Sequence, residues 1–329
     1  MRVTITALAT AILLLLAAPP AAEAQPTGKV PRIGYLGMNR PEDLPHLLEA
    51  LRQGLRDLGR VEGQNIIIEY RWAEGPADRL PALATELVRL NVDVIIAAAL
   101  QAIQAAQKAT KTIPIVVTGT GDPVGDKLAV SLARPGGNIT GLTALGGAQI
   151  VGKQLQLRKE IVPGVSRFAV LGNPENTYHA FLIKEAEATA RSFEVQVRVF
   201  QVRNPDQLDQ AFAAMRREHA GALLVLGDGM FFGQRARIAD LASKSRLAAM
   251  YNNAEYVDAG GLMAYEASLL ERFRRVATYA DKILKGSKPG DLPFEQPSKY
   301  ALVINMKATK ALGLTIPPSL LLRADRVIE

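Results

Sequence analysis

The chain has 329 residues, of which 48% are hydrophobic and 22% charged, an ordinary globular composition with enough apolar material for two medium-sized cores. It contains no cysteine, which excludes disulfides, thiolate metal sites and cysteine nucleophiles. The formal charge is +7, but the basic residues are scattered and form no stripe interleaved with aromatic residues, so we expect no nucleic-acid partner.

The first 24 residues have the features of a secretory signal peptide. Arg2 gives a short basic start, residues 3–18 are apolar apart from threonines, and Ala22-Glu23-Ala24 is an A-x-A cleavage site. Because the apolar stretch is short for a membrane span and ends at Pro19-Pro20, we favour cleavage over retention as an anchor. No cysteine follows that could carry a lipid, so the sequence predicts a soluble exported protein and not a lipoprotein.

From residue 32 onward, short β-branched runs alternate with helical patterns. Strands are expected at residues 32–38, 65–72, 92–99, 115–117 and 139–143, and helices at 44–58, 76–90 and 102–109. Between the last two strands, TGTG at 118–121 is read as a loop. Asp122-Pro123 then resembles a helix start, so a helix is expected as far as Leu132, ended by Pro135-Gly136-Gly137. Strands that alternate with helices predict a parallel sheet with right-handed crossovers.

The second half of the chain repeats this pattern. RIGYLG at 32–37 has a counterpart in RFAVLG at 167–172, and PGG at 135–137 has one in AGG at 259–261. All βα proteins look broadly alike in sequence, but the same order of strand motifs and glycine-containing turns in both halves favours a duplication. We therefore predict two copies of one five-stranded βα unit.

The segments that link the copies predict a hinge. Helices are expected at 149–161 and 269–284, a proline-rich traversing loop at 287–298, a last strand at 300–305 and a short helix at 307–312. The predicted division is 25–144 plus 269–290 for lobe one and 145–268 plus 291–329 for lobe two. The strand at 300–305 is expected in the second sheet. Several crossings between lobes suit closure around a ligand.

The sequence contains no recognisable catalytic set. His46, His179 and His219 are far apart and share no motif, and there is no metal-ligand spacing, G-x-S-x-G elbow or Walker loop. We therefore expect no enzyme, no metal and no cofactor.

The residues at strand ends are the candidate binding residues, because open α/β sheets bind ligands at the carboxyl ends of their strands. They offer hydroxyls, amides, backbone N–H groups and a central carboxylate, which suits a small polar ligand. The candidates are Met38, Asn39, Ala99, Leu100, Thr118, Thr120, Asp122, Asn173, Asp228, Gly229, Met230, Asn252, Tyr265 and Glu266.

Two of the carboxylates have alternative interpretations. Thr118, Thr120 and the amides leading to Asp122 can hold a ligand carboxylate, and Asp228 can hold an ammonium. For Asp122 we favour plain helix capping, whereas for Asp228, between two glycines, a binding role and turn formation are equally compatible.

Several longer motifs carry a family resemblance. IGYLG at 33–37, EYRWAEG at 69–75, LARPGGNITGLT at 132–143 and LPFEQPSKYALVIN at 292–305 are among them. With these motifs the chain resembles the exported solute-binding components of ABC transporters related to tryptophan- and tyrosine-binding proteins. The resemblance implies a periplasmic-binding-protein type I-like fold of two Rossmann-like lobes around a cleft. It also implies a periplasmic monomer that delivers a small molecule to an ABC permease of the inner membrane.

The chain departs from the pattern of that family at two cleft positions. Ala99-Leu100 stands where a Gly-Thr pair is usual, and Tyr265-Glu266 stands where Tyr-Gly is usual. These departures would change the ligand, so an aromatic amino acid is not carried over from the resemblance. An amino acid or similar zwitterion is expected because a positive helix start on one lobe faces the Asp228 carboxylate on the other, and a basic amino acid or polyamine is the alternative if Glu266 points inward. Two other functions stay open, a ligand-sensing domain for a membrane receptor and an exported α/β enzyme.

Overall fold

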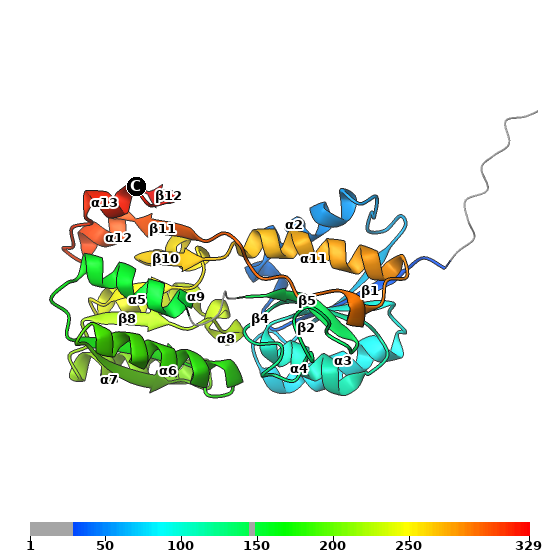
Figure 1. Cartoon of the computed structure of the whole chain (residues 1–329), viewed down its shortest axis with the longest axis horizontal. Coiled ribbons are helices and arrows are strands. Elements are labelled where there is room, and N and C mark those ends of the chain that lie inside the picture. Colours follow the sequence, from blue (N-terminus) through cyan, green and yellow to red (C-terminus); the bar gives the residue numbers. More distant parts are fainter. Residues whose placement is uncertain (1–28, 145–148) are drawn as a thin grey trace, which may run out of the picture. The chain divides into compact units, whose positions relative to one another are not determined.

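The computed structural model describes residues 29–144 and 149–329 of the chain. The predicted signal peptide and the predicted start of lobe two at residues 145–148 lie outside the described residues. The unit from Pro31 to Glu329 contains two α/β lobes, each built on its own sheet (Figure 1). Within the described part of the chain, no helix is long and apolar enough to cross a membrane.

The sheet of lobe one is parallel throughout and has the strand order β2-β1-β3-β4-β5. Its strands are β1 (Arg32–Gly37), β2 (Ile67–Trp72), β3 (Val94–Ala98), β4 (Ile115–Thr120) and β5 (Ile139–Thr143). The helices α3 (Leu80–Arg89) and α4 (Leu100–Ala109) cover one face, and α2 (Pro45–Arg56) and α11 (Leu269–Leu284) cover the other (Figure 1).

Burial patterns explain these layers. The central strands β3 and β4 are runs of fully buried valine and isoleucine, as expected for strands covered on both faces. Leu47, Leu51 and Leu55 recur every fourth residue on α2 and are all buried. Gly54 lets α11 approach, since a Cβ there would lie 2.5 Å from the carbonyl oxygen of Arg274. Helix α11 is thus packed onto lobe one although it follows the strands of lobe two.

The sheet of lobe two repeats the strand order of lobe one and extends it. Strands β6 (Arg167–Gly172), β7 (Gln196–Gln201), β8 (Ala222–Val225), β9 (Ala248–Tyr251) and β10 (Met263–Glu266) lie parallel in the order β7-β6-β8-β9-β10. This matching order confirms the predicted repeat. Strand β11 (Ala301–Asn305) then pairs antiparallel with β10, which confirms the predicted sheet for the last strand. The sequence did not predict β12 (Arg326–Ile328), which pairs with β11.

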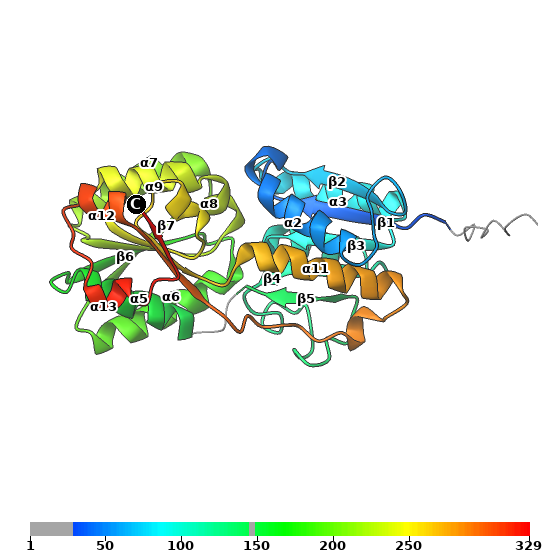
Figure 2. The ribbon, with the colours of Figure 1, turned by 90° about the horizontal axis from the view of Figure 1, so that it is seen from above.

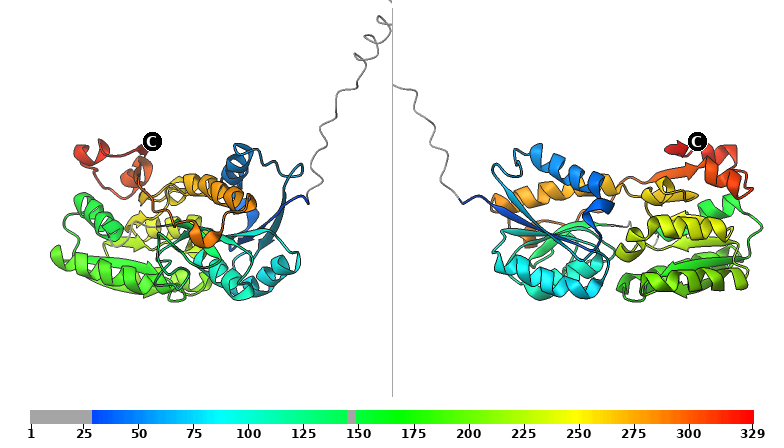
Figure 3. Two further views of the ribbon diagram at one scale, coloured as in Figure 1. Left: turned by 45° about the vertical axis from the view of Figure 1, so that its right-hand side comes forward. Right: turned by 180° about the vertical axis from the view of Figure 1, so that it is seen from behind.

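Helices cover both faces of the second sheet (Figure 2). One face carries α5 (Gln149–Ile161) and α6 (Thr177–Ser192), and the other carries α7 (Leu208–Arg217) and α9 (Arg235–Lys244). Two short helices, α8 (Gly229–Gly233) and α10 (Glu255–Asp258), follow β8 and β9. The C-terminal helices α12 (Met306–Ala311) and α13 (Pro318–Leu321) lie on lobe two beside β11 (Figure 3).

The return crossing runs along lobe one before it enters lobe two. The Thr140 hydroxyl donates to the carbonyl of Leu292 (2.6 Å), and the Thr143 N–H donates to the carbonyl of Glu295 (2.8 Å). The segment 292–295 therefore lies beside β5, a few residues past the lobe limit expected at 290. Those limits stay predictions.

The segment after β4 differs from its prediction. Strand β4 continues through Thr120, so residues 118–120 are strand and not loop. The expected helix from Asp122 to Leu132 does not form, and residues 121–138 are turns and bends. The Asp122 carboxylate accepts from the N–H groups of Val124 (3.1 Å) and Gly125 (2.9 Å), and Lys127 then adopts φ +55°. A tight turn followed by a left-handed residue cannot propagate an α-helix.

Candidate functional site

A cavity of about 150 Å³ lies where the carboxyl ends of the two sheets face each other. Lobe one lines it with residues that follow β1 and β3 and with the end of β4, and lobe two lines it with residues that follow β6, β8 and β9. An engineered apolar cavity of about 150 Å³ in another protein takes up benzene, so this space fits a small molecule.

Most of the predicted site residues meet in this cavity. Its lining includes Met38, Asn39, Ala99, Leu100, Thr118, Thr120, Asp228, Gly229 and Asn252. The other candidates, Asp122, Asn173, Met230, Tyr265 and Glu266, are not among the lining residues. Choosing residues at the carboxyl ends of strands thus selected residues around one cavity, but it did not separate those that line the cavity from those beside it.

Asp228 is the carboxylate of the cavity. It is the N-cap of α8, and its Oδ1 accepts from the N–H of Met230 (2.9 Å) and the amide of Asn173 (3.2 Å). Its Oδ2 accepts from the amides of Asn176 (3.1 Å) and Gln101 (3.2 Å). Among the described ion pairs none neutralises Asp228, which is 8% exposed. Neutral donors thus hold the carboxylate in place and leave its charge available to a cationic ligand group.

Asn173 and Met230 therefore act one step from the cavity. They orient Asp228 instead of lining the space themselves. Capping and a site role are combined at Asp228, so the two interpretations offered by its glycine-flanked position are compatible.

Arg272 is the basic side chain of the cavity, and the sequence analysis missed it. It lies on α11, where it is grouped with Arg274 and Arg275 in what reads as a solvated helix face. Its Nη1 donates to the carbonyl of Thr118 (3.4 Å), and its buried Nε has no partner among the described residues. Burial lowers the pKa of the guanidinium, and the carboxylate of Glu266 acts in the opposite direction. Arg272 therefore places a guanidinium in the lining of the cavity, while its Nε is buried without a described partner.

The anion site predicted at Thr118, Thr120 and the amides before Asp122 stays a prediction, and two of its expected features differ in the structure. The Thr120 hydroxyl donates to the Asp126 carboxylate (3.2 Å), so its hydrogen is already engaged. The helix whose first amides would have supported a carboxylate near Asp122 is absent, and Asp122 binds amides of its own turn. The basic side chain in the lining of the cavity is instead Arg272.

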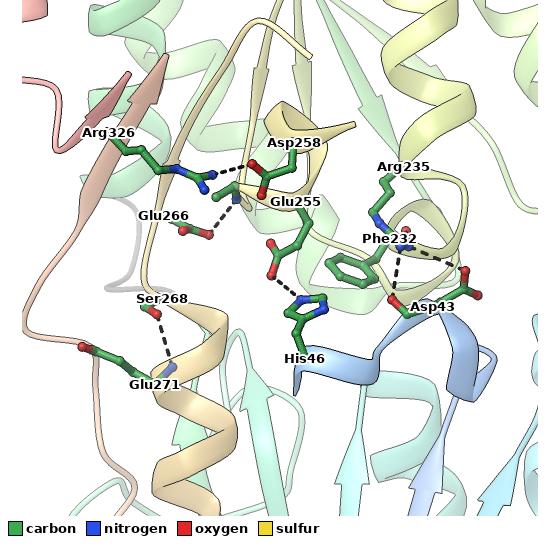
Figure 4. A network of polar contacts seen from close by, with 11 residues as sticks. Asp43, His46, Phe232, Arg235, Glu255, Asp258, Glu266, Ser268, Glu271 and Arg326 are labelled. Atoms are coloured by element: carbon green, nitrogen blue, oxygen red, sulfur yellow. Dashed lines mark hydrogen bonds and ion pairs between the residues drawn. The ribbon is translucent and has the colours of Figure 1, made fainter. Parts of the chain in front are cut away.

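Glu266 lies at the end of β10 and bonds within lobe two (Figure 4). Its carboxylate accepts from the N–H of Ala254 (2.8 Å) and is 8% exposed. Burial raises the pKa of this carboxyl to about 7, and repulsion from Glu255 adds to the shift. The neighbouring Tyr265 stacks on Tyr300, with the ring centres 5.5 Å apart. Neither residue lines the cavity. The alternative of a cationic ligand required Glu266 to point inward, so it is not supported.

Apolar and aromatic side chains form the rest of the wall. Tyr35, Phe232 and Phe273 are buried lining residues, with Tyr178 at the lobe-two side. Burial raises the pKa of the Tyr35 hydroxyl, which has no hydrogen-bond partner among the described residues. The hydroxyl therefore stays neutral, and it is buried behind the surface of the cavity.

The buried histidine near the cavity has a structural role. The Nδ1 of His179 accepts from the N–H of Asn173 (2.8 Å), so its Nε2 carries the hydrogen donated to the carbonyl of Gly227 (3.0 Å). Burial lowers the pKa of its imidazole, which keeps the ring neutral. The described residues contain no cluster of three or more His, Cys, Asp or Glu side chains arranged to hold a metal ion.

Known proteins share this architecture and sequence. A tyrosine-binding protein of Clostridioides difficile is 24% identical over 282 residues, which cover 85% of this chain and 81% of that protein. Two solved structures superpose with TM-scores of 0.85 over 91% of this chain and all of their own. They are a conserved domain protein of Vibrio cholerae, at 28% identity, and an ABC domain of Streptococcus pneumoniae in complex with L-Trp, at 25%.

The fold is therefore that of the type I periplasmic binding proteins, with two parallel-dominated sheets in two lobes. The family model of the ABC transporter substrate binding proteins matches residues 43–328, nearly the whole described chain. That family consists of binding proteins and not of enzymes. On the combined grounds of fold and sequence, this chain belongs to the ABC transporter substrate-binding proteins.

Proposed function

We propose that the protein binds an amino acid in the cavity between its lobes and delivers it to the permease of an ABC importer. The observation that carries the proposal is a pair of opposite charges in one small cavity. Asp228 comes from lobe two, and Arg272 comes from the helix packed on lobe one. A zwitterion with its ammonium at Asp228 and its carboxylate at Arg272 satisfies both.

The walls of the cavity favour an uncharged side chain on this amino acid. Leu44, Leu47, Phe232 and Phe273 are apolar lining residues, and beyond Asp228 and Arg272 the lining supplies no other charged group. The relatives named for tyrosine and for a complex with L-Trp bind amino acids of this kind. The whole amino acid, and not only its side chain, has to fit the cavity volume of about 150 Å³.

The location and the partner in this proposal are supported by the family and by the amino-terminal sequence. Substrate-binding proteins of ABC transporters work outside the inner membrane, and the first 24 residues have the pattern of a secretory signal peptide. Together they support the proposal of a periplasmic protein that hands its ligand to an inner-membrane permease.

Calorimetry on a panel of amino acids and their one-charge analogues tests the proposal. Each amino acid is compared with the amine that lacks the carboxylate and with the acid that lacks the ammonium. Asp228→Asn and Arg272→Gln should each weaken amino-acid binding by roughly ten- to hundredfold, because each removes a charge-assisted hydrogen bond of about 1.5–3 kcal/mol. Asp122→Asn is the matched control, since Asp122 does not line the cavity. Undiminished binding in both cavity variants contradicts the zwitterion model.

A further inference from the structure

One carboxylate outside the cavity joins the two lobes. Asp126 lies in the turns between β4 and β5 of lobe one and is half-buried. Its Oδ1 accepts from the hydroxyl of Thr177 (2.7 Å), the first residue of α6 in lobe two. Its Oδ2 accepts from the hydroxyl of Thr120 (3.2 Å), which lines the cavity. Two hydroxyls from opposite lobes therefore share a single anion.

The other side-chain contacts across the cleft are longer. Inside the cavity the amide of Gln101 in lobe one donates to Asp228 in lobe two (3.2 Å), and two further contacts lie at Arg235 and His46 (Figure 4). The Arg235 guanidinium donates to the carbonyl of Asp43 (3.1 Å) and stands 3.9 Å from its carboxylate. His46 and Glu255 are 3.5 Å apart. The His46–Glu255 pair is exposed and contributes little, whereas the Arg235–Asp43 contact is partly buried. The Thr177–Asp126 bond is the shortest hydrogen bond between side chains of the two lobes among the described residues.

The charge of Asp126 depends on these two hydroxyls. Burial raises the pKa of its carboxyl, the hydrogen bonds from Thr177 and Thr120 lower it, and the nearby Asp122 raises it again. No basic side chain pairs with Asp126 in the described ion pairs. When the lobes separate, the Thr177 bond is lost and the carboxylate keeps only its partner in lobe one.

We propose that Asp126 is a positioning residue that holds the lobes closed and fixes the polarity of the Thr120 hydroxyl toward the ligand. Since the hydrogen of Thr120 is committed to Asp126, only oxygen lone pairs face the cavity, and these accept from an N–H group. Thr120 then helps to recognise the ammonium beside Asp228, which rests on the amino-acid proposal above. The contact across the lobes does not depend on the identity of the ligand.

The chain lends itself to a direct measurement of closure because it contains no cysteine. Spin labels on cysteines placed at Arg89 of α3 and Arg217 of α7, both exposed, report the distance between the lobes. The closed population is compared in the full mature chain for Asp126→Ala, Thr177→Val and Thr177→Ser. Asp122→Asn is the control: it leaves both described hydrogen bonds of Asp126 in place and removes only a neighbouring negative charge that raises the pKa of Asp126, so closure should not fall.

We expect the ratio of closed to open molecules to fall about three- to tenfold in Asp126→Ala and Thr177→Val. This is the range of an ordinary net hydrogen bond, which applies here because Thr177 is exposed to solvent. Thr177→Ser keeps the hydroxyl and should restore closure, and the double variant should lose no more than either single variant. Melting temperatures should stay unchanged, because the contact lies outside both cores. A closed population that does not change in either loss variant, with saturating L-tyrosine or L-tryptophan and without, overturns the proposal.

The two proposals fail in different ways. If no amino acid binds but closure still depends on Asp126 and Thr177, the contact between lobes stands and the ligand assignment is wrong. If amino acids bind with unchanged dissociation rates in Asp126→Ala and Thr177→Val, the ligand assignment stands and Asp126 has no positioning role.

Discussion

Replacing Glu266 by glutamine isolates the cost of one buried carboxylate. Glu266 is 8% exposed, and its one described hydrogen bond comes from the N–H of Ala254 (2.8 Å). The amide oxygen of glutamine can accept the same bond. The substitution therefore removes the ionisable group and keeps the shape and the hydrogen bond.

The expected gain in the free energy of unfolding follows from the pKa of the Glu266 carboxyl in the folded and in the unfolded chain. In the unfolded chain it ionises near 4.5, and in the folded chain burial raises its pKa to about 7. Between these values the folded state holds a proton that the unfolded state has lost, so stability falls as the pH rises and levels off above the folded pKa. The difference corresponds to about 3 kcal/mol at 1.36 kcal/mol for each pKa unit. Glutamine avoids that loss.

Thermal unfolding at pH 5 and pH 8 measures the effect. We expect Glu266→Gln to melt several degrees higher than the parent protein at pH 8 and close to it at pH 5. Glu271→Gln, at an exposed glutamate of α11, controls for a general change in charge. A variant of Glu266 that is equally stabilising at both pH values, or destabilising at pH 8, refutes the assignment of a buried carboxyl with a raised pKa.

Two further substitutions test packing. Arg158 is fully buried against the ring of Phe168 and donates to the carbonyl of Ala248, and two of its guanidinium nitrogens have no described partner. Arg158→Met should therefore leave the melting temperature equal or higher. A fall of several degrees contradicts this. Gly229→Ala places a Cβ 2.8 Å from the Cβ of Ala99 in lobe one, so it should weaken amino-acid binding at least tenfold without lowering the melting temperature. Gly152→Ala is the control, because its added Cβ has its nearest neighbour at 3.5 Å, and it should bind normally in the same titration.

The fold was readable from the sequence because its signals are redundant. The strands of both sheets are short apolar runs, and the bounds expected for the helix at 269–284 and the strand at 139–143 coincide with α11 and β5. The failure between Asp122 and Leu132 has a specific cause. An Asp-Pro pair followed by leucines four residues apart is equally compatible with a helix start and with an Asx turn. The positive φ of Lys127, which decides between them, leaves no mark in the sequence.

The candidate site could be predicted only in part, because one of its residues lies on α11, which returns from lobe two to pack on lobe one. Strand ends converge by topology alone, which is why Asp228 and Thr118 could be placed without coordinates. Arg272 reaches the cavity because α11 returns to lobe one and packs on α2 at Gly54. Its neighbours Arg274 and Arg275 carry the same side chain but are exposed. The helical period does distinguish Arg272, which lies four residues before the buried Val276 and seven before the buried Tyr279, and this signal was not used.

The placement of the two charges has a consequence for selectivity. Asp228 and Arg272 lie in a cavity that closure screens from water, and a charge left there without a partner costs several kcal/mol. An amine satisfies Asp228 but leaves the guanidinium unpaired, and a carboxylic acid does the reverse. Only a ligand that carries both groups compensates both residues at once. Closure around an amino acid is thus favoured over closure around either analogue, even where the analogue makes the same contact at its own end.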